Sequence, residues 1–473
     1  MASKAKIHDL FLQDLKSALP GLKIHQDADQ LNQNGRDASE DLVFLPELVV
    51  YPESAEDVSE IARCCNLHSI PLTTRGAGTG LSGGALPVAG GVVLNTMRMN
   101  RILHIDTENL QATIEPGVIN YEFQEAVALK GLMYPPDPAS WGSCTMGGNV
   151  AHSSGGPRAL KYGTTRDYIL NLEVVLADGT RFWTGANTLK YSTGYNLTHL
   201  FIGSEGTLGI VTKIVCKLIP HSTLKYLMLV PFASAVQACK SVGAVFRAGI
   251  TPCAMEFMER SAMEWSIRYG NLNFTIEDHW KALLLIEVDG FNADVLMSTC
   301  ESISTLMYEH GASEILFADS AEQQQTLWNI RRKVGEAVKS NSVYKEEDTV
   351  VPRAALPELL EAVKEIGQRY GFESVCYGHA GDGNLHVNII KGNLSDEDWK
   401  LRVPEGIKEL FLVCKRLGGT ISGEHGIGWV QKSYLPIVCT ESQMHLMKAI
   451  KTAFDPKNIL NPGKILPDFI TGF

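Results

Sequence analysis

Apolar positions recur along the chain with two periods, and the period separates predicted helices from predicted strands. After Ser54, the residues Val58, Ile61 and Cys65 follow at helical spacing, and Ser54 with Asp57 resembles a capping box. Another helix is expected at 120–130. Shorter apolar runs predict strands at 70–74, 91–95, 112–115 and 210–219. The Asp-Gly pair within 171–180 predicts a turn between two further strands, and this alternation favours an α/β or α+β unit.

Beyond residue 220 the predicted elements are longer and lack glycine-rich loops. Strands are predicted at 226–231 and 282–288, and helices at 233–247, 293–310 and 320–340. This pattern is typical of an antiparallel sheet covered by helices. The tail at 453–464 contains Asp-Pro and Asn-Pro-Gly turns, so we expect it to dock on the first part of the chain.

Length and composition limit the architecture. A chain of 473 residues exceeds one hydrophobic core. We expect domains at 1–220 and 221–440, followed by a C-terminal segment, 441–473, that returns to the first domain. The longest apolar runs, such as 226–232, are too short to cross a bilayer, and the N-terminal residues lack the apolar stretch of a signal peptide. A cytoplasmic location, or one peripheral to the membrane through a partner, is therefore expected.

Charge and cysteine spacing exclude several classes of function. The net charge is −11 and no basic cluster is found, which argues against nucleic-acid binding. None of the ten cysteines belongs to a C-x-x-C pair, so thiolate-bound zinc and iron–sulfur clusters are not expected. Reduced, buried thiols are the simplest interpretation of these residues.

A glycine-rich loop at 75–84 suggests a phosphate site. Its residues Gly78 to Gly83 match G-x-G-x-x-G, but Pro87 and the glycines around it forbid the helix that a Rossmann fingerprint requires. Glycines also let successive backbone N–H groups approach a pyrophosphate without a helix, and Arg75 adds positive charge. Tight turns in a compact β-rich domain are the alternative explanation.

Two histidines and a carboxylate form a candidate metal site. The segment 377–389 is predicted to form two strands around a Gly-Asp-Gly turn, which can bring His379 and His386 within ligand distance. Farther on, Glu424 and His425 stand between glycines. Two imidazoles and one carboxylate suit zinc, manganese or iron and leave positions for substrate oxygens. Taken alone, histidines in such places are more often hydrogen-bonded core or surface groups.

Four segments carry a resemblance to a known family: PLTTRGAGTGLSGG (71–84), GSCTMGGNVA (142–151), GGPRALKYG (155–163) and LFIGSEGTLGIVT (200–212). They resemble the PCMH-type FAD-binding domain of the vanillyl-alcohol-oxidase superfamily, and within it the group of glycolate oxidase flavin subunits, D-lactate dehydrogenases and D-2-hydroxyglutarate dehydrogenases. The resemblance extends from about residue 46 to residue 464. It implies an α+β fold, in which an FAD domain of two α/β subdomains is joined to a cap domain with an antiparallel sheet covered by helices.

The resemblance implies a non-covalent FAD. Members that attach FAD covalently carry a histidine in the first glycine loop, and residues 76–80 contain none. The residues implied to contact the cofactor are Arg75, Gly76, Gly78, Thr79, Gly80, Ser82, Pro136, Asp137, Ser143, Gly147, Gly148, Asn149, Ser153, Gly155, Glu205, Gly209, Ile210 and Asn461.

The resemblance also assigns roles at the substrate. The metal ligands are implied to be His379, His386 and Glu424, with zinc expected and manganese or iron as alternatives. His425 resembles the general base, and Arg331 and Lys345 resemble residues that bind the substrate carboxylate. Gly335 stands where the 2-hydroxyglutarate enzymes carry a threonine. If the substrate has a second, distal carboxylate, Arg332 or Arg353 would have to bind it.

These observations predict an enzyme that oxidises a small D-2-hydroxy acid, such as D-lactate or glycolate, to the 2-keto acid. His425 would take the hydroxyl proton while hydride passes to the flavin, and a quinone, an electron-transfer flavoprotein or a partner subunit would accept the electrons. The alternatives are a D-2-hydroxyglutarate dehydrogenase, a metal-free flavin alcohol oxidase that uses oxygen, and a non-catalytic flavin-binding subunit. The sequence leaves open the acid, the metal, the acceptor and the oligomeric state, which includes a homodimer.

Overall fold

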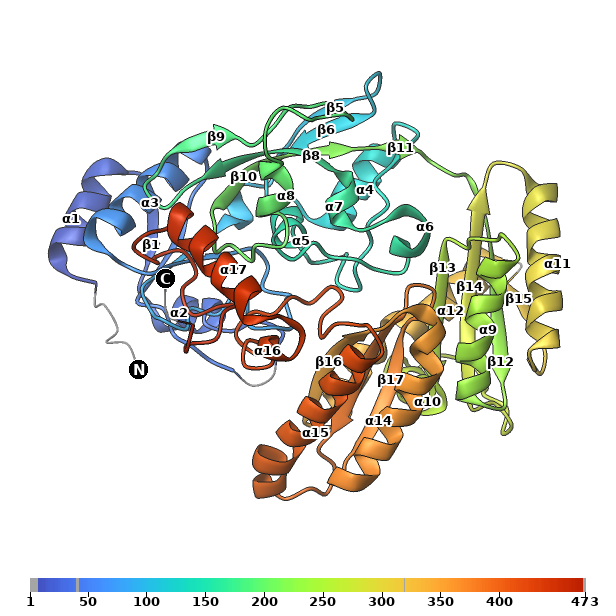
Figure 1. Ribbon diagram of the computed structural model, residues 1–473. Helices are drawn as coiled ribbons and strands as arrows, with labels where there is room; N and C mark the ends of the chain where they lie inside the picture. Colours follow the sequence, from blue (N-terminus) through green and yellow to red (C-terminus); the bar gives the residue numbers. More distant parts are fainter. Residues whose placement is uncertain (1–6, 40–41, 319, 471–473) are drawn as a thin grey trace. The chain divides into compact units, whose positions relative to one another are not determined.

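The computed structural model describes residues 7–39, 42–318 and 320–470, and its chain forms two compact units (Figure 1). The first unit contains the described residues up to Ser154, then 164–221, then those from Glu424 onward. The second unit contains 155–163 and 222–423. The second predicted domain therefore ends at residue 423 and not at the expected residue 440, because the segment that follows Gly423 folds with the first unit.

The first unit begins with a sheet of four strands in the order β1-β2-β4-β3. Only β1 runs antiparallel to its neighbour. The strands are β1 (Lys23–His25), β2 (Leu48–Tyr51), β3 (Leu72–Arg75) and β4 (Val92–Asn95). Helix α3 (Ala55–His68) links β2 to β3 and starts with the predicted capping box of Ser54 and Asp57, which is confirmed.

A second, antiparallel sheet of five strands has the order β5-β6-β10-β8-β9. Its strands are β5 (Ile102–Asp106), β6 (Gln111–Ile114), β8 (Ile169–Val175), β9 (Arg181–Trp183) and β10 (Ile210–Lys217). The predicted Asp-Gly turn joins β8 to β9. One apolar core connects both sheets, because Val58 and Ile61 of α3 belong to the same cluster as Leu48 and Ile210.

Shorter elements complete the first unit. They are α1 (Asp9–Ala18), α2 (Ala28–Asn34), η1 (Thr96–Arg98), α4 (Asn120–Ala128), β7 (Leu132–Met133), α5 (Met146–His152), α7 (Thr165–Tyr168), α8 (Leu197–Phe201), β11 (Ile219–Pro220), α16 (Leu435–Val438) and α17 (Glu441–Phe454). After α17 the chain runs beside β3. There Leu72 N–H donates to the Ile459 carbonyl at 2.8 Å, and Ile459 and Leu460 enter the core.

The second unit is built on an antiparallel sheet of seven strands in the order β15-β12-β14-β13-β17-β18-β16. These strands are β12 (Leu224–Phe232), β13 (Ala254–Glu259), β14 (Ala282–Gly290), β15 (Leu316–Ala318), β16 (Tyr344–Val350), β17 (Glu373–His379) and β18 (Asn384–Ile390). The predicted α+β class and the antiparallel sheet covered by helices are confirmed.

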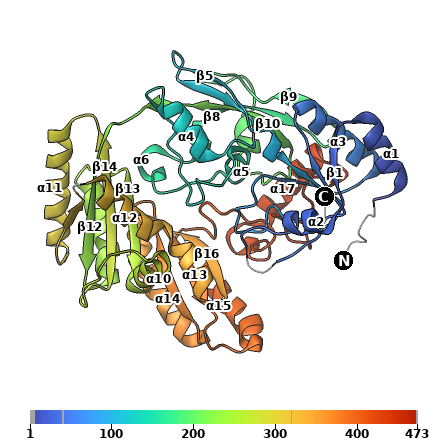
Figure 2. The same cartoon turned by 180° about the vertical axis from the view of Figure 1, so that it is seen from behind.

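Helices cover both faces of this sheet (Figures 1 and 2). One face packs against α9 (Ala235–Arg247), α11 (Ala293–Glu309), α14 (Leu356–Tyr370) and α15 (Asp396–Arg416). The other face packs against α10 (Arg260–Gly270), α12 (Ala321–Arg332) and α13 (Val334–Asn341). The single helix predicted at 320–340 is wrong, since the chain breaks it at Lys333. The short helices α6 (Ala159–Tyr162) and η2 (Arg353–Ala355) also belong to this unit.

Within the described residues, each helix is too short or too polar to span a bilayer.

Candidate cofactor cleft and histidine site

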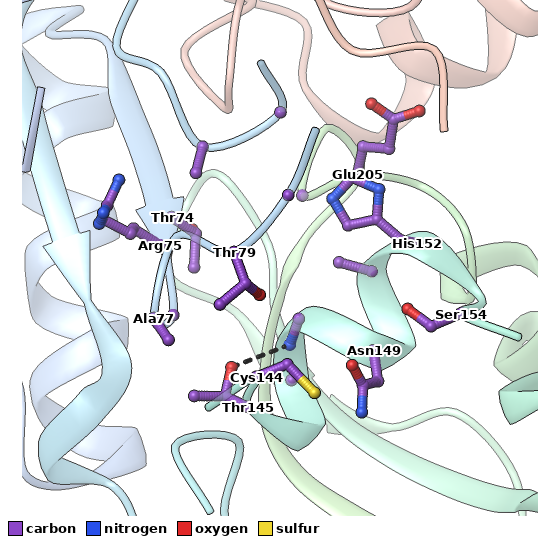
Figure 3. Close-up of a pocket in the computed structure, with 18 of the residues that line it drawn as sticks. Thr74, Arg75, Ala77, Thr79, Cys144, Thr145, Asn149, His152, Ser154 and Glu205 are labelled. Atoms are coloured by element: carbon purple, nitrogen blue, oxygen red, sulfur yellow. Dashed lines mark hydrogen bonds between the residues drawn. The ribbon is translucent and has the colours of Figure 1, made fainter. Parts of the chain in front are cut away.

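A cleft in the first unit gathers three glycine-rich segments. It encloses about 1300 Å³, counting the part that is open to solvent. Figure 3 shows side chains around it from the loop after β3, from helix α5 and from the loop after α8.

The loop after β3 presents backbone to this cleft. Residues 76–91 form no helix. The prediction that this loop is not a Rossmann fingerprint is therefore confirmed. Gly78 has a φ of +76°, and a Cβ there would clash with the Arg75 guanidinium. Arg75 is itself 93% buried and donates from Nη1 to the Arg36 carbonyl, so it braces the loop from behind. Burial lowers the pKa of Arg75, and Asp37 partly offsets this effect.

Helix α5 begins in the glycine-rich segment 142–151, for which the sequence analysis predicted no helix. Thr145 caps the helix by accepting a hydrogen bond from Gly148 N–H at 3.3 Å (Figure 3). Asn149 and His152 line the cleft from this helix. The helix packs close to its neighbours, since Gly147 N–H donates to the Pro116 carbonyl at 2.7 Å. Thr145 is a good N-cap signal, but two glycines in seven residues conceal the helix.

The loop after α8 is held by Glu205, which adopts a φ of 52° and is 95% buried. Its carboxylate accepts hydrogen bonds from the N–H groups of Ile427, at 2.8 Å, and Gly428, at 2.7 Å. The Asn461 amide donates to the carbonyls of Gly84 and Glu205, at 2.9 and 2.8 Å. Asn461 therefore fastens two loops of the cleft together and does not line it.

Most of the residues that the resemblance implied as cofactor contacts line this cleft: Arg75, Gly76, Gly78, Thr79, Gly80, Gly147, Gly148, Asn149, Glu205, Gly209 and Ile210. Six others lie in the first unit outside the lining: Ser82, Pro136, Asp137, Ser143, Ser153 and Asn461. Gly155 belongs to the second unit. Ser82 has a clear local role, because its hydroxyl donates to the His425 carbonyl at 2.8 Å. Glu424 and His425 also line the cleft.

The second unit carries the two histidines on neighbouring strands. The predicted hairpin is confirmed, with Tyr377 of β17 paired to His386 of β18. His379 and His386 are at least 95% buried, and their ring centroids lie 5.4 Å apart. The hairpin thus brings together two of the three residues that were predicted as metal ligands.

Glu256 of β13 orients His379 and Arg331. Its carboxylate lies 2.8 Å from His379 Nδ1 and 2.7 Å from a terminal nitrogen of Arg331, and it is fully buried. Burial alone would raise the pKa of Glu256, but His379 and Arg331 lower it below its ordinary value. A carboxylate on Nδ1 directs Nε2 of the imidazole outward, which is the usual arrangement of a metal-binding histidine.

Arg331 and Lys345 lie on opposite faces of the sheet. Arg331 stacks 4.9 Å from the Tyr377 ring centroid, and its Nε has no hydrogen-bond partner among the described residues. The Lys345 ammonium instead lies 5.5 Å from the Trp399 ring centroid of α15. Lys345 pairs with Ile389, whereas its neighbour Glu346 pairs with Asn388 on the face of His386. Both residues were predicted to bind the substrate carboxylate, and the structure places Lys345 on the other face of the sheet from Arg331, because successive strand residues point to opposite faces.

Asp348 connects the histidine strands to the end of the second unit. Its carboxylate lies 3.7 Å from His386 Nδ1 and accepts hydrogen bonds from the Asn384 amide at 2.8 Å and Gly423 N–H at 2.7 Å. Glu424 and His425 are the next two residues of the chain. The sequence analysis did not predict Asp348 and Glu346 as site residues, because a Glu-Glu-Asp run is typical of a solvated surface segment. The local sequence also does not indicate that this strand pairs with β18.

The fold has relatives among solved structures. The crystal structure of p-cresol methylhydroxylase with substrate bound matches with a TM-score of 0.78 at 20% identity, over 98% of each chain. At this identity the match shows the fold alone.

Curated relatives are much more similar in sequence. The glycolate oxidase subunit GlcD of Bacillus subtilis (strain 168) is 39% identical over 432 residues, which cover 91% of each chain. The D-lactate dehydrogenase of Anaerostipes hadrus is 37% identical over 425 residues, which cover 89% of each chain.

Two family models match in order along the chain. One describes an FAD binding domain and matches residues 46–185. The other describes the C-terminal domain of FAD linked oxidases and matches residues 223–465. The chain therefore belongs to the FAD-linked oxidase family and is an FAD-linked oxidoreductase with a PCMH-type FAD-binding domain.

Proposed function

We propose that the protein oxidises a small D-2-hydroxy acid, of the size of D-lactate or glycolate, to the corresponding 2-keto acid. Relatives with these two substrates in their names match about nine-tenths of the chain at 37–39% identity. Arg331, whose guanidinium is held in place by Glu256, suits a substrate that carries a carboxylate.

The cleft of the first unit fits FAD held without a covalent bond. Gly76 and Gly78 leave backbone exposed where a side chain would collide with Thr145 or Arg75, so N–H groups are available to a pyrophosphate. Asn149 and His152 offer polar side chains farther along the cleft. Bound FAD supplies the two-electron acceptor for the oxidation.

The histidine pair fits a divalent metal ion. His379 and His386 are buried neighbours, and Glu256 directs His379 Nε2 away from itself. We propose that Glu424 completes the ligand set and that the ion is zinc, with manganese or iron as alternatives. Such an ion supplies electrostatic stabilisation to the substrate hydroxyl as it loses its proton.

The observation that carries this proposal is that hydrogen bonds hold the segment 424–426 at both of its ends. The segment follows Gly423, whose N–H is bonded to Asp348, and it precedes Ile427, whose N–H is bonded to Glu205. Both ends of this short segment are thus anchored by buried carboxylates. We propose that His425, in the middle of it, accepts the proton of the substrate hydroxyl, while Arg331 binds the substrate carboxylate.

The electrons leave through an external acceptor in this proposal. None of the ten cysteines has the spacing of an iron–sulfur site. A quinone, an electron-transfer flavoprotein or a partner subunit would then reoxidise the flavin, in a protein that works in the cytoplasm or at the membrane surface.

Replacing His425 with alanine tests the proposed base. Loss of a general base typically costs 10²–10⁴-fold, so turnover of D-lactate or glycolate with a dye acceptor should fall at least about 100-fold. FAD content, measured by visible absorbance, should stay unchanged. The control is His104→Ala, since His104 is an exposed residue of β5. Near-normal turnover of His425→Ala would exclude His425 as the base.

A further inference from the structure

Strand β16 places a carboxylate beside the histidine pair. Glu346 pairs with Asn388 and shares its face with His386, and its side chain is only 9% exposed. Its Oε1 lies 3.8 Å from His386 Nδ1 and accepts a hydrogen bond from the Tyr377 hydroxyl at 3.4 Å. The site therefore has negative charge next to the proposed metal ligands, in addition to the cation that Arg331 provides.

Tyr377 lies between these two charges. Its ring faces the Arg331 guanidinium at 4.9 Å, and its hydroxyl reaches Glu346. Beside that hydroxyl stands Gly335, where an added Cβ would lie 3.4 Å from the Tyr377 oxygen. A substrate with its carboxylate at Arg331 and its hydroxyl at the histidines would direct the rest of its carbon chain toward this corner of Gly335, Tyr377 and Glu346.

Three cations of the second unit make aromatic contacts away from this corner. Arg353 lies 3.8 Å from the Phe246 ring centroid, on the α9 side of the sheet. Arg332 lies 5.2 Å from the Trp328 ring centroid. Lys345 points to α15 on the opposite face. A second buried carboxylate, Asp348, adds to the negative charge near His386.

We propose that Glu346 determines substrate specificity by excluding 2-hydroxy acids with a second carboxylate and admitting those with an uncharged tail. The inference rests on the proposed function and narrows its substrate class to monocarboxylic acids. Like charges a few ångströms apart in a partly buried site repel strongly, so a dicarboxylate is disfavoured by about 100-fold or more. A carboxylate oxygen accepts hydrogen bonds, so a hydroxyl on the tail remains compatible.

The test compares the FAD- and metal-loaded enzyme with its Glu346→Gln variant on D-lactate, D-glycerate, D-malate and D-2-hydroxyglutarate, with a dye acceptor. The variant keeps the shape of the side chain and removes its charge. We expect kcat/KM for the two dicarboxylates to rise at least about tenfold, and that for D-lactate to change less than about threefold. Glu373→Gln is the matched control, because Glu373 is an exposed residue of β17.

A binding measurement separates this inference from the proposed function. Pyruvate and 2-oxoglutarate are titrated against the flavin absorbance of both proteins, and 2-oxoglutarate should bind at least about tenfold more tightly to Glu346→Gln than to the unaltered enzyme. If no acid is oxidised by the unaltered enzyme, the proposed function fails, and this titration still decides the role of Glu346. An unchanged ratio of dicarboxylate to monocarboxylate in both assays overturns the inference. So does loss of bound metal from the variant without any gain for dicarboxylates.

Discussion

Glu256 carries a carboxylate with no exposed surface, and it holds two side chains to which we assign functions. One is His379, at 2.8 Å, and the other is Arg331, at 2.7 Å. A buried charge is tolerated only when it is paired and hydrogen-bonded, and Glu256 meets both conditions. It therefore sets the tautomer of His379 and the direction of Arg331 at once.

Replacing Glu256 with glutamine should weaken metal binding. The amide can no longer hold both His379 and Arg331 by charge, and loss of such an orienting partner typically costs 10–100-fold in metal affinity. Competition with a chromogenic chelator measures this affinity. Glu309→Gln is the control, since Glu309 is exposed at the end of α11. Equal affinity in the two variants would show that Glu256 does not orient His379.

Gly78 holds the loop after β3 in a conformation that other residues avoid, with a φ of +76°. Replacing it with alanine should strain the backbone by about 1–2 kcal/mol and push the new methyl group against Arg75. We expect the dissociation constant of FAD, measured by flavin fluorescence, to rise at least about tenfold.

Gly142→Ala is the matched control for Gly78→Ala. Gly142 belongs to the segment 142–151, which carries part of the family resemblance, but an added Cβ there meets nothing within 4 Å. Unaltered FAD affinity in both variants would contradict the assignment of the loop after β3 to the cofactor.

At the scale of elements, the hairpin of β17 and β18 could be predicted from the sequence because it is local. Six residues separate His379 from His386, and a Gly-Asp-Gly turn lies among them. The alternation of side chains along a strand then sets the face of His386. The face of Lys345 depends instead on the register between β16 and β18, which are about 40 residues apart. A shift of one residue reverses every side chain, and Glu346 takes the place expected for Lys345.

Lys464 joins the segment after α17 to the loop after β3 by hydrogen bonds. Its ammonium group donates to the carbonyls of Gly84 and Leu86 and to the Asn461 side chain. Burial lowers the pKa of Lys464 from 10.5 to about 7, although Glu205 and Asp37 act in the opposite direction. The folded protein therefore releases this proton at a lower pH than the unfolded chain.

This pKa shift predicts a pH dependence of stability. Between pH 7 and pH 10 the unfolded chain binds more protons at Lys464, so the free energy of unfolding should rise with pH by up to about 1.4 kcal/mol per unit. In Lys464→Met this contribution is absent. Thermal unfolding at pH 7, 8 and 9 should show the unaltered protein gaining melting temperature relative to the variant. Parallel pH profiles would mean that Lys464 titrates normally.

At the scale of the whole molecule, the chain leaves the first unit twice, for residues 155–163 and for residues 222–423. The family motifs locate the glycine loops of the cofactor cleft, since those residues are constrained by backbone approach. The structural roles of Glu205 and Asn461 could not be predicted in this way, because their hydrogen bonds join segments more than 200 residues apart. Such long-range pairing, and the position of the return to the first unit, cannot be inferred from local periodicity.

The central claim is that a 2-hydroxy acid reduces the bound flavin with the help of a metal ion. The most direct measurement mixes the purified, FAD-loaded protein with D-lactate or glycolate without oxygen and follows the visible absorbance of the flavin, before and after removal of metal by a chelator. The account predicts rapid bleaching with one equivalent of 2-keto acid per flavin, loss of bleaching after chelation, and recovery when zinc or manganese is added. Equal bleaching by the metal-free protein, or no bleaching with any 2-hydroxy acid, would contradict it.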